Sequence, residues 1–153
     1  MTDQELMEAI AAKLAELWPD RMLYRDFCPA DFKRPSGFLY VTNAGWTDAN
    51  LWMVQWTMEA ELTLYAATDV YTAESTEALR RDQLAVLQAF GGPSLQVGDR
   101  YVPLALETPS PGPGEAYVRF SAAWLDGRPG ADPDDGSAPL MEHFELNIST
   151  EKE

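Results

Sequence analysis

The alternation of apolar and polar residues between Leu51 and Ala66 is the clearest pattern in the chain. From Trp52 onward, apolar residues occupy every second position, and polar residues such as Glu59 and Glu61 lie between them. Side chains alternate between the two faces of a β-strand, so this pattern predicts a long strand with one buried face. The run also contains good helix formers, but the period of two favours the strand. A strand of this length is expected to extend beyond its own core and to pack partly against another chain.

The N-terminal pattern predicts an amphipathic helix over residues 3–17. Apolar residues recur at spacings of four, four and three: Leu6, Ile10, Leu14 and Leu17. This spacing is typical of one helical face. Thr2 and Glu5 fit a capping box at the start of the helix. Pro19 ends it, because the residue before a proline is displaced from the helical conformation.

A second amphipathic helix is predicted after Thr72, which can cap it. Glu74 and Glu77 follow in the first turn, where the helix dipole favours acidic side chains. The apolar side of this helix consists of Leu79, Leu84, Val86, Leu87 and Phe90. The Gly-Gly-Pro sequence at residues 91–93 ends it.

Shorter runs rich in aromatic and β-branched residues predict further strands. These runs are residues 22–27, 37–43, 95–97, 100–106 and 116–125. The Gly98-Asp99 pair joins two of them as a β-hairpin. The Asn, Gly and Asp content of residues 43–50 predicts a turn, and the proline-rich residues 108–114 predict a loop that cannot continue a sheet.

The end of the chain differs in composition from the rest. Residues 126–139 are rich in Asp, Pro and Gly, which is typical of a linker. Residues 141–148 alternate again and predict a short strand. The apolar face of this strand includes Phe144, Leu146 and Ile148. We therefore expect one domain over residues 1–126, followed by a linker and a C-terminal arm over residues 127–153.

The order of predicted elements favours the α+β class. One helix, three strands, a second helix and three further strands suit an antiparallel β-sheet with two helices packed on one face, plus a C-terminal extended arm. The chain has 153 residues, of which 46% are hydrophobic. This size and composition suffice for a single domain with a substantial core.

Charge restricts the possible partners. The chain carries 11 Lys+Arg against 25 Asp+Glu, a net charge of −14. Such a surface repels phosphate, so neither specific nucleic-acid binding nor attachment to an anionic membrane is expected. No apolar run approaches the ~18 residues that span a bilayer, and a single cysteine, Cys28, allows no internal disulfide. The acidic N-terminal segment does not resemble a signal peptide, and we expect a cytosolic protein.

The charges are also unevenly distributed. Residues 35–79 contain six acidic residues and no Lys or Arg. The only locally basic stretch is Arg21 to Arg34, where four bases stand against Asp26 and Asp31. Either this asymmetry is ordinary solvation of an exposed surface, or one face of the molecule is kept negative for its function.

Few residues indicate catalysis. His143 is the only histidine and Cys28 has no motif around it, so a surface histidine and a half-buried thiol are the simpler interpretations. Glu59 and Glu61 share one strand face and could act as paired carboxylates, although solvated strand positions are far more common. Residues 132–136 resemble a calcium loop, but His143 stands where an EF-hand requires a bidentate Glu. We expect no catalytic residue, no cofactor and no metal ligand.

The tryptophans allow three interpretations. Trp46, Trp52, Trp56 and Trp124 could line a ligand pocket, belong to the core, or anchor an interface, since Trp is enriched at binding hot spots.

Five segments of the chain carry a resemblance to a known family. They are residues 14–19 at the end of the first helix, 23–27, 33–41, 61–65 at the end of the long strand, and the helix around Leu79. In this order they resemble the small tail terminator proteins of long-tailed bacteriophages and prophages, especially those of Gram-positive bacteria. The resemblance runs over roughly residues 3–125, and residues 144–148 are similar to the end of many such proteins. The loop at 108–114 and the Asp-rich linker depart from the family pattern.

The resemblance implies a structural α+β protein without catalytic residues. Tail terminators form a hexameric ring that caps the finished tail tube, stops its polymerisation and presents a surface to the head's connector. The expected partners are thus further copies of the chain, the tail tube protein and the head-tail connector. The expected location is the bacterial host cytoplasm during assembly and then the virion tail.

Two sets of residues are candidate sites under this interpretation. Glu59 and Glu61 are predicted for the lumen or the tube-facing surface, because an acidic lumen lets DNA slide. The candidate inter-subunit contacts are Trp52, Trp56, Phe144, Leu146 and Ile148. Ring closure would be head to tail, and residues 141–148 could add a strand to a neighbour's sheet edge.

Three alternatives stay open at this point. The chain could be another neck or tail component, such as a head-completion or tube subunit. It could be a small α+β ligand-binding domain with an aromatic pocket. An enzyme is the least favoured alternative, and it would require a carboxylate or His143 to meet another polar group in a cleft.

Overall fold

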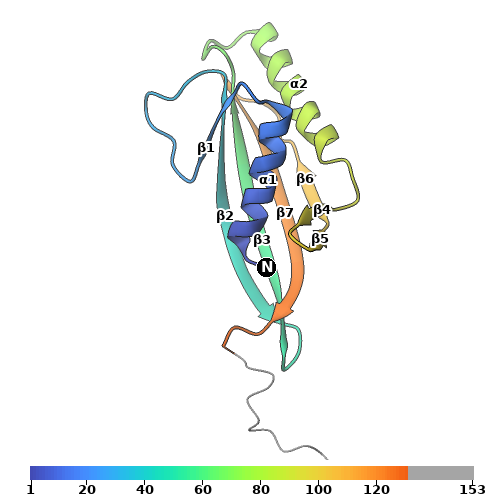
Figure 1. Ribbon diagram of the computed structural model, residues 1–153. Coiled ribbons are helices and arrows are strands. Elements are labelled where there is room, and N and C mark those ends of the chain that lie inside the picture. Colours follow the sequence, from blue (N-terminus) through green and yellow to red (C-terminus); the bar gives the residue numbers. More distant parts are fainter. Residues whose placement is uncertain (131–153) are drawn as a thin grey trace, which may run out of the picture.

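The computed structural model describes residues 1–130 as two helices and seven strands (Figure 1). In chain order these elements are α1 (Asp3–Leu17), β1 (Met22–Arg25), β2 (Ser36–Asp48), β3 (Met53–Tyr65), α2 (Ala73–Ala89), β4 (Leu95–Val97), β5 (Arg100–Val102), β6 (Leu104–Glu107) and β7 (Glu115–Gly127). Neither helix is both long and apolar enough to cross a membrane. The predicted strand at residues 141–148 and most of the predicted linker lie outside the described residues.

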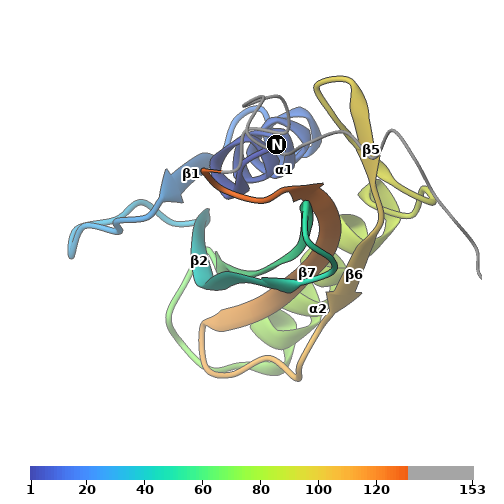
Figure 2. The same cartoon turned by 90° about the horizontal axis from the view of Figure 1, so that it is seen from below.

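Five strands form one sheet in the order β1-β2-β3-β7-β6, and β4 and β5 form a separate two-stranded hairpin. β1 runs parallel to β2, whereas the other neighbours in the sheet are antiparallel. The three long central strands curve strongly, as Figure 2 shows from below. The predicted α+β fold is confirmed, with the single addition of a parallel edge strand.

Both helices contribute to one hydrophobic core on one face of the sheet. Leu6, Ile10 and Leu14 of α1 are buried together with Leu79 and Val86 of α2. The strands contribute alternate residues to this core: Met58, Ala60, Leu62 and Leu64 from β3, and Ala116, Val118, Phe120, Ala122 and Trp124 from β7. The period of two that predicted the long strand is thus the alternation between this helix-covered face and the opposite, open face.

Local signals placed both helices correctly. Thr2 and Glu5 form the predicted capping box, in which the Thr2 hydroxyl accepts from the Glu5 backbone N–H at 3.2 Å. Thr72 caps α2 through its hydroxyl, which accepts from Ser75 N–H at 3.1 Å. The predicted bounds of α1 match the structure, because capping and chain termination by proline act within a few residues.

The turn predicted for residues 43–50 is wrong. β2 continues to Asp48, and the actual turn spans residues 49–52. Trp46 pairs with Trp56 of β3, and these cross-strand contacts outweigh the turn preference of the nearby Asn and Gly. Asn50 closes the turn, since its side-chain oxygen accepts from the backbone N–H groups of Trp52 and Met53.

Two shorter elements also differ from the prediction. β1 ends at Arg25, where Asp26 adopts a left-handed conformation with φ of 59°. The predicted strand 100–106 is divided at Pro103 into β5 and β6, which belong to different sheets. A proline has no N–H for the ladder, so a break at this position is expected on physical grounds.

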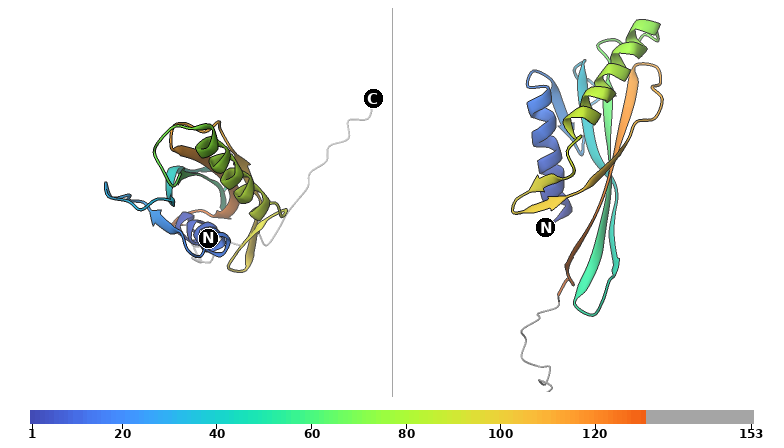
Figure 3. Two further views of the ribbon diagram at one scale, coloured as in Figure 1. Left: turned by 90° about the horizontal axis from the view of Figure 1, so that it is seen from above. Right: turned by 90° about the vertical axis from the view of Figure 1, so that its right-hand side faces the viewer.

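The long strands extend past the helices. The β2–β3 turn and the end of β7 project beyond the N-terminus of α1 (Figure 3). The long strands thus extend past the helices, although Val54 and Met58 on the inner face of β3 are buried. The expected packing of this part against another chain stays a prediction. We call residues 43–58 together with 122–127 the projecting ribbon; at its base, Met58, Ala122 and Trp124 still belong to the core.

Candidate functional site

The sheet face opposite the helices is uncovered in the described part of the chain and carries polar and aromatic side chains. We call it the open sheet face. The register places Tyr40, Glu61 and Arg119 side by side on adjacent strands, and the next row consists of Glu59 and Ser121 with Ala105. Glu59 and Glu61, the predicted acidic pair, therefore do share this face.

Glu61 lies at the centre of a hydrogen-bonded cluster. Its Oε1 accepts from the Tyr40 hydroxyl at 2.5 Å, and its Oε2 accepts from Arg119 Nε at 3.2 Å. Burial, followed by the hydrogen bond to Glu61, raises the pKa of Tyr40 to about 12. Arg119 offsets the charge of Glu61, so this carboxylate is not a free acid on the sheet.

A second tyrosine–glutamate pair lies beside the first. The Tyr117 hydroxyl donates to Glu115 Oε2 at 2.7 Å, and this bond, together with burial, raises the pKa of Tyr117 to about 12. Phe38 stacks on Tyr40 with ring centroids 4.7 Å apart. This end of the open sheet face is thus lined by aromatic rings, which border a depression of about 350 Å³.

The other end of the open sheet face is hollow. Its side chains are small: Thr57, Ala105, Ser121 and Ala123. Adjoining this floor is a depression of about 410 Å³ that Glu59, Glu61 and Glu107 border. Glu59 and Glu107 are exposed, and within residues 1–130 neither carboxylate has a side-chain partner. We call this depression with its small-residue floor the acidic hollow.

The projecting ribbon exposes large apolar side chains. Leu51 is 81% exposed, Trp52 54% and Trp46 44%. Trp46, Trp56 and Trp124 form a row across β2, β3 and β7, and the last two stack with ring centroids 6.2 Å apart. Of the predicted contact residues, Trp52 is exposed in the turn and Trp56 is half-buried on β3. The structure does not bring these two indoles into a common pocket.

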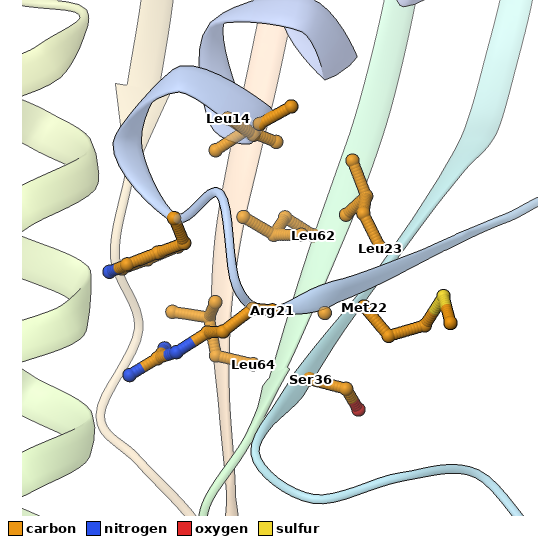
Figure 4. Close-up of a pocket in the computed structure, with 10 residues that line it drawn as sticks. Leu14, Arg21, Met22, Leu23, Ser36, Leu62 and Leu64 are labelled. Carbon is orange, nitrogen blue, oxygen red and sulfur yellow. The ribbon is translucent and has the colours of Figure 1, made fainter.

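A small, partly open pocket lies between the end of α1 and the strands β1 to β3 (Figure 4). Leucines from α1, β1 and β3 line it, with Ser36 at its edge. Its volume of about 20 Å³ holds one water molecule, whereas organic ligands need several hundred. Within residues 1–130 the Ser36 hydroxyl is buried without a hydrogen-bond partner, and Figure 4 shows it pointing away from the leucines.

The other residues considered for chemistry do not converge on a site in the described chain. Cys28 is half-buried and lies beside Tyr65. Burial, followed by the neighbouring thiol, raises the pKa of Tyr65 to about 12. Across residues 1–130 no three His, Cys, Asp or Glu side chains lie close enough to hold a metal ion. His143, residues 132–136 and the predicted contacts Phe144, Leu146 and Ile148 lie outside the described residues.

Comparisons with known proteins show no family for this chain. No protein-family model matches it, and no curated protein matches it. Among solved structures 26 chains match, including one without a descriptive name at 12% identity. The matched region covers 86% of this chain and 99% of that structure, with a TM-score of 0.38.

Sequence reasoning missed the partners of Glu61. Arg119 and Tyr40 stand 58 and 21 residues from Glu61 along the chain, and only the strand register brings them together. The alternation assigned the residues from Val54 to Leu64 to their faces correctly, but Trp52, which it placed on the buried face, is exposed in the turn. It held no information on which residues of neighbouring strands stand opposite one another.

Proposed function

We propose that the protein is a structural assembly subunit, a phage tail terminator that closes into a hexameric ring and caps the tail tube. The observation that supports this proposal best is the projecting ribbon, a three-stranded extension with exposed tryptophans and unpaired edges. The resemblance of residues 3–125 to tail terminators supplies the identity of the assembly.

The edges of the ribbon are open to pairing. β1 pairs with β2 only as far as Leu39, and β6 pairs with β7 only as far as Ala122. In the described chain, β2 from Asn43 onward and β7 from Ala123 onward thus pair with β3 alone. The other edge of each strand is unpaired there. Unpaired strand edges favour pairing with another chain.

The two edges are different surfaces of one molecule. A contact between unlike surfaces joins copies head to tail, and such contacts close into a ring when the rotation between neighbours permits it. The exposed Trp46 and Trp52 would anchor these contacts, because buried aromatic side chains dominate interface energetics. Residues 141–148 are a further candidate for pairing with a neighbour's edge.

The lumenal role of Glu59 and Glu61 stays a prediction. A net charge of −14 favours a channel that DNA passes without being held. Arg119 offsets Glu61, so on the open sheet face the negative potential comes mainly from Glu59 and Glu107.

The proposal is tested on tails themselves. We expect purified chain, added to tail tubes that polymerise in vitro, to stop their growth and to appear as a ring at one end by electron microscopy. Trp52→Ser should weaken this capping, whereas Leu84→Ser, which removes a similarly exposed apolar side chain from α2, should not. Tubes that grow unchanged, or a chain that itself polymerises into long tubes, would contradict a terminator.

A further inference from the structure

We propose that the loop between β1 and β2, residues 26–35, docks into the acidic hollow of a second copy of the chain. This inference rests on the proposed self-assembly and names the contact that would join neighbouring subunits. It places Glu59 in that contact and not in the lumen.

The loop projects from the side of the sheet as a separate knob. Figures 1 and 2 both show it extending away from β1 and from the helices. The left-handed Asp26 turns the chain out of the strand, and Phe27 follows with 75% of its surface exposed. A phenylalanine buries roughly 150–250 Å² when it is covered. Phe27 is thus the largest apolar contribution that this loop can make to an interface.

The base of the loop is held firmly. Phe32 packs on Tyr65 with ring centroids 4.1 Å apart, and the Arg34 guanidinium lies 4.9 Å from the Phe32 ring centre. Arg34 Nη1 also donates to the backbone oxygens of Ala66 and Gly114, at 3.3 and 3.4 Å. A knob that is already ordered loses less conformational entropy on docking than a flexible loop does.

The hollow offers a matching surface. Its floor of small side chains leaves room above the sheet for an inserted ring. Its rim carries the carboxylates of Glu59 and Glu107, and Arg119 on the same rim is paired with Glu61. The Phe120 and Ala60 backbone lies beneath the same depression. An apolar ring can therefore enter while cations beside it reach the rim.

Charge selects a second copy as the occupant. The chain is strongly acidic, so two copies repel each other unless a basic patch on one meets an acidic patch on the other. The loop is flanked by exposed Arg25 and Lys33, which form no salt bridge within residues 1–130. Asp26 and Asp31 balance these two cations, and Arg34 leaves residues 25–34 with a net charge of +1 in a chain of −14. Phe27 therefore supplies most of the contact area, and the cations fix its orientation.

The contact is tested by charge exchange in the full-length protein. Sedimentation velocity would measure self-association of the wild type, of Glu59→Lys with Glu107→Lys, and of Arg25→Glu with Lys33→Glu. We expect each reversed pair to weaken association about tenfold or more. Combining all four substitutions should restore it, since the attraction is then re-formed with exchanged signs.

Control variants separate this contact from general effects. Glu16→Lys changes the charge at an exposed position of α1 and should leave association unchanged. Phe27→Ser should weaken it. Thermal unfolding by circular dichroism checks that every variant folds.

Three results would overturn the proposal. The first is that the reversed pairs associate like the wild type, as they would if Glu59 faced a lumen. The second is that the combined variant shows no rescue. The third is that the wild type stays monomeric. Tail capping is scored separately on tubes, so a failed docking contact and a failed terminator function give different results.

Discussion

At the residue scale, Glu61 shows how a predicted acidic position acquires a different role from its neighbours. The alternation indicated a solvated carboxylate beside Glu59. The register adds Tyr40 and Arg119, which engage both oxygens of Glu61 and leave Glu59 free within residues 1–130. Two acids of the same strand face therefore differ in their bonding, since Glu61 is paired across the sheet and Glu59 has no side-chain partner in the described residues.

The cluster predicts a change in the titration of Tyr40. Its pKa is about 12 in the folded chain and about 10 in an unfolded one, so its contribution to stability is complete below pH 10 and is lost as pH rises toward 12. Glu61→Gln removes the acceptor charge but leaves the burial, so we expect the pKa of Tyr40 to fall part of the way back toward 10. The measurement is the ultraviolet absorbance of phenolate against pH.

Glu59→Gln is the matched control for this titration. This variant removes the Glu59 carboxylate, which lies on the same strand face two residues from Glu61 and has no hydrogen bond to Tyr40. Equal titration curves for the two variants would show that Glu61 does not hold the Tyr40 proton.

At the element scale, α2 is fixed to the sheet by a buried polar residue as well as by its apolar face. Gln83 is 5% exposed, and its side-chain nitrogen donates to the backbone oxygens of Pro109 and Tyr117 at 2.8 and 2.9 Å. These bonds join α2 to both the 108–114 loop and β7. The helical pattern of residues 72–90 gave no sign of this, because Gln83 reads as an ordinary polar position.

Gln83→Leu should lower the free energy of unfolding by about 2 kcal/mol, since two buried carbonyl oxygens then lose their donor. Gln88→Leu, an exposed position on the same helix, should change it by less than about 0.5 kcal/mol. Urea unfolding measures both. Equal values would mean that water replaces the Gln83 side chain without cost.

The elements themselves were predictable to the extent that they depend on nearby residues. Thr2, Thr72 and Pro19 define helix boundaries locally, and the alternation from Trp52 defines the faces of β3. The extension of β2 to Asp48 and the parallel pairing of β1 depend on contacts between distant segments. So do the acidic hollow and the projecting loop, which exist only after the sheet has assembled.

At the scale of the whole molecule, the helices cover only part of one sheet face. The projecting ribbon, the open sheet face and the β1–β2 loop are therefore left for contacts with other molecules. These surfaces point in different directions, which suits head-to-tail assembly better than a symmetric pair. The account as a whole thus depends on the chain forming a closed ring.

The most direct test is the mass of the assembled wild-type protein, measured by native mass spectrometry with and without a divalent cation. A subunit of 17.0 kDa predicts a discrete hexamer of about 102 kDa, and electron microscopy of the same sample should show closed rings. Open filaments of undefined mass, or closed rings of another subunit number, would contradict the account. A 17.0 kDa monomer that also leaves tail tubes uncapped would contradict it as well.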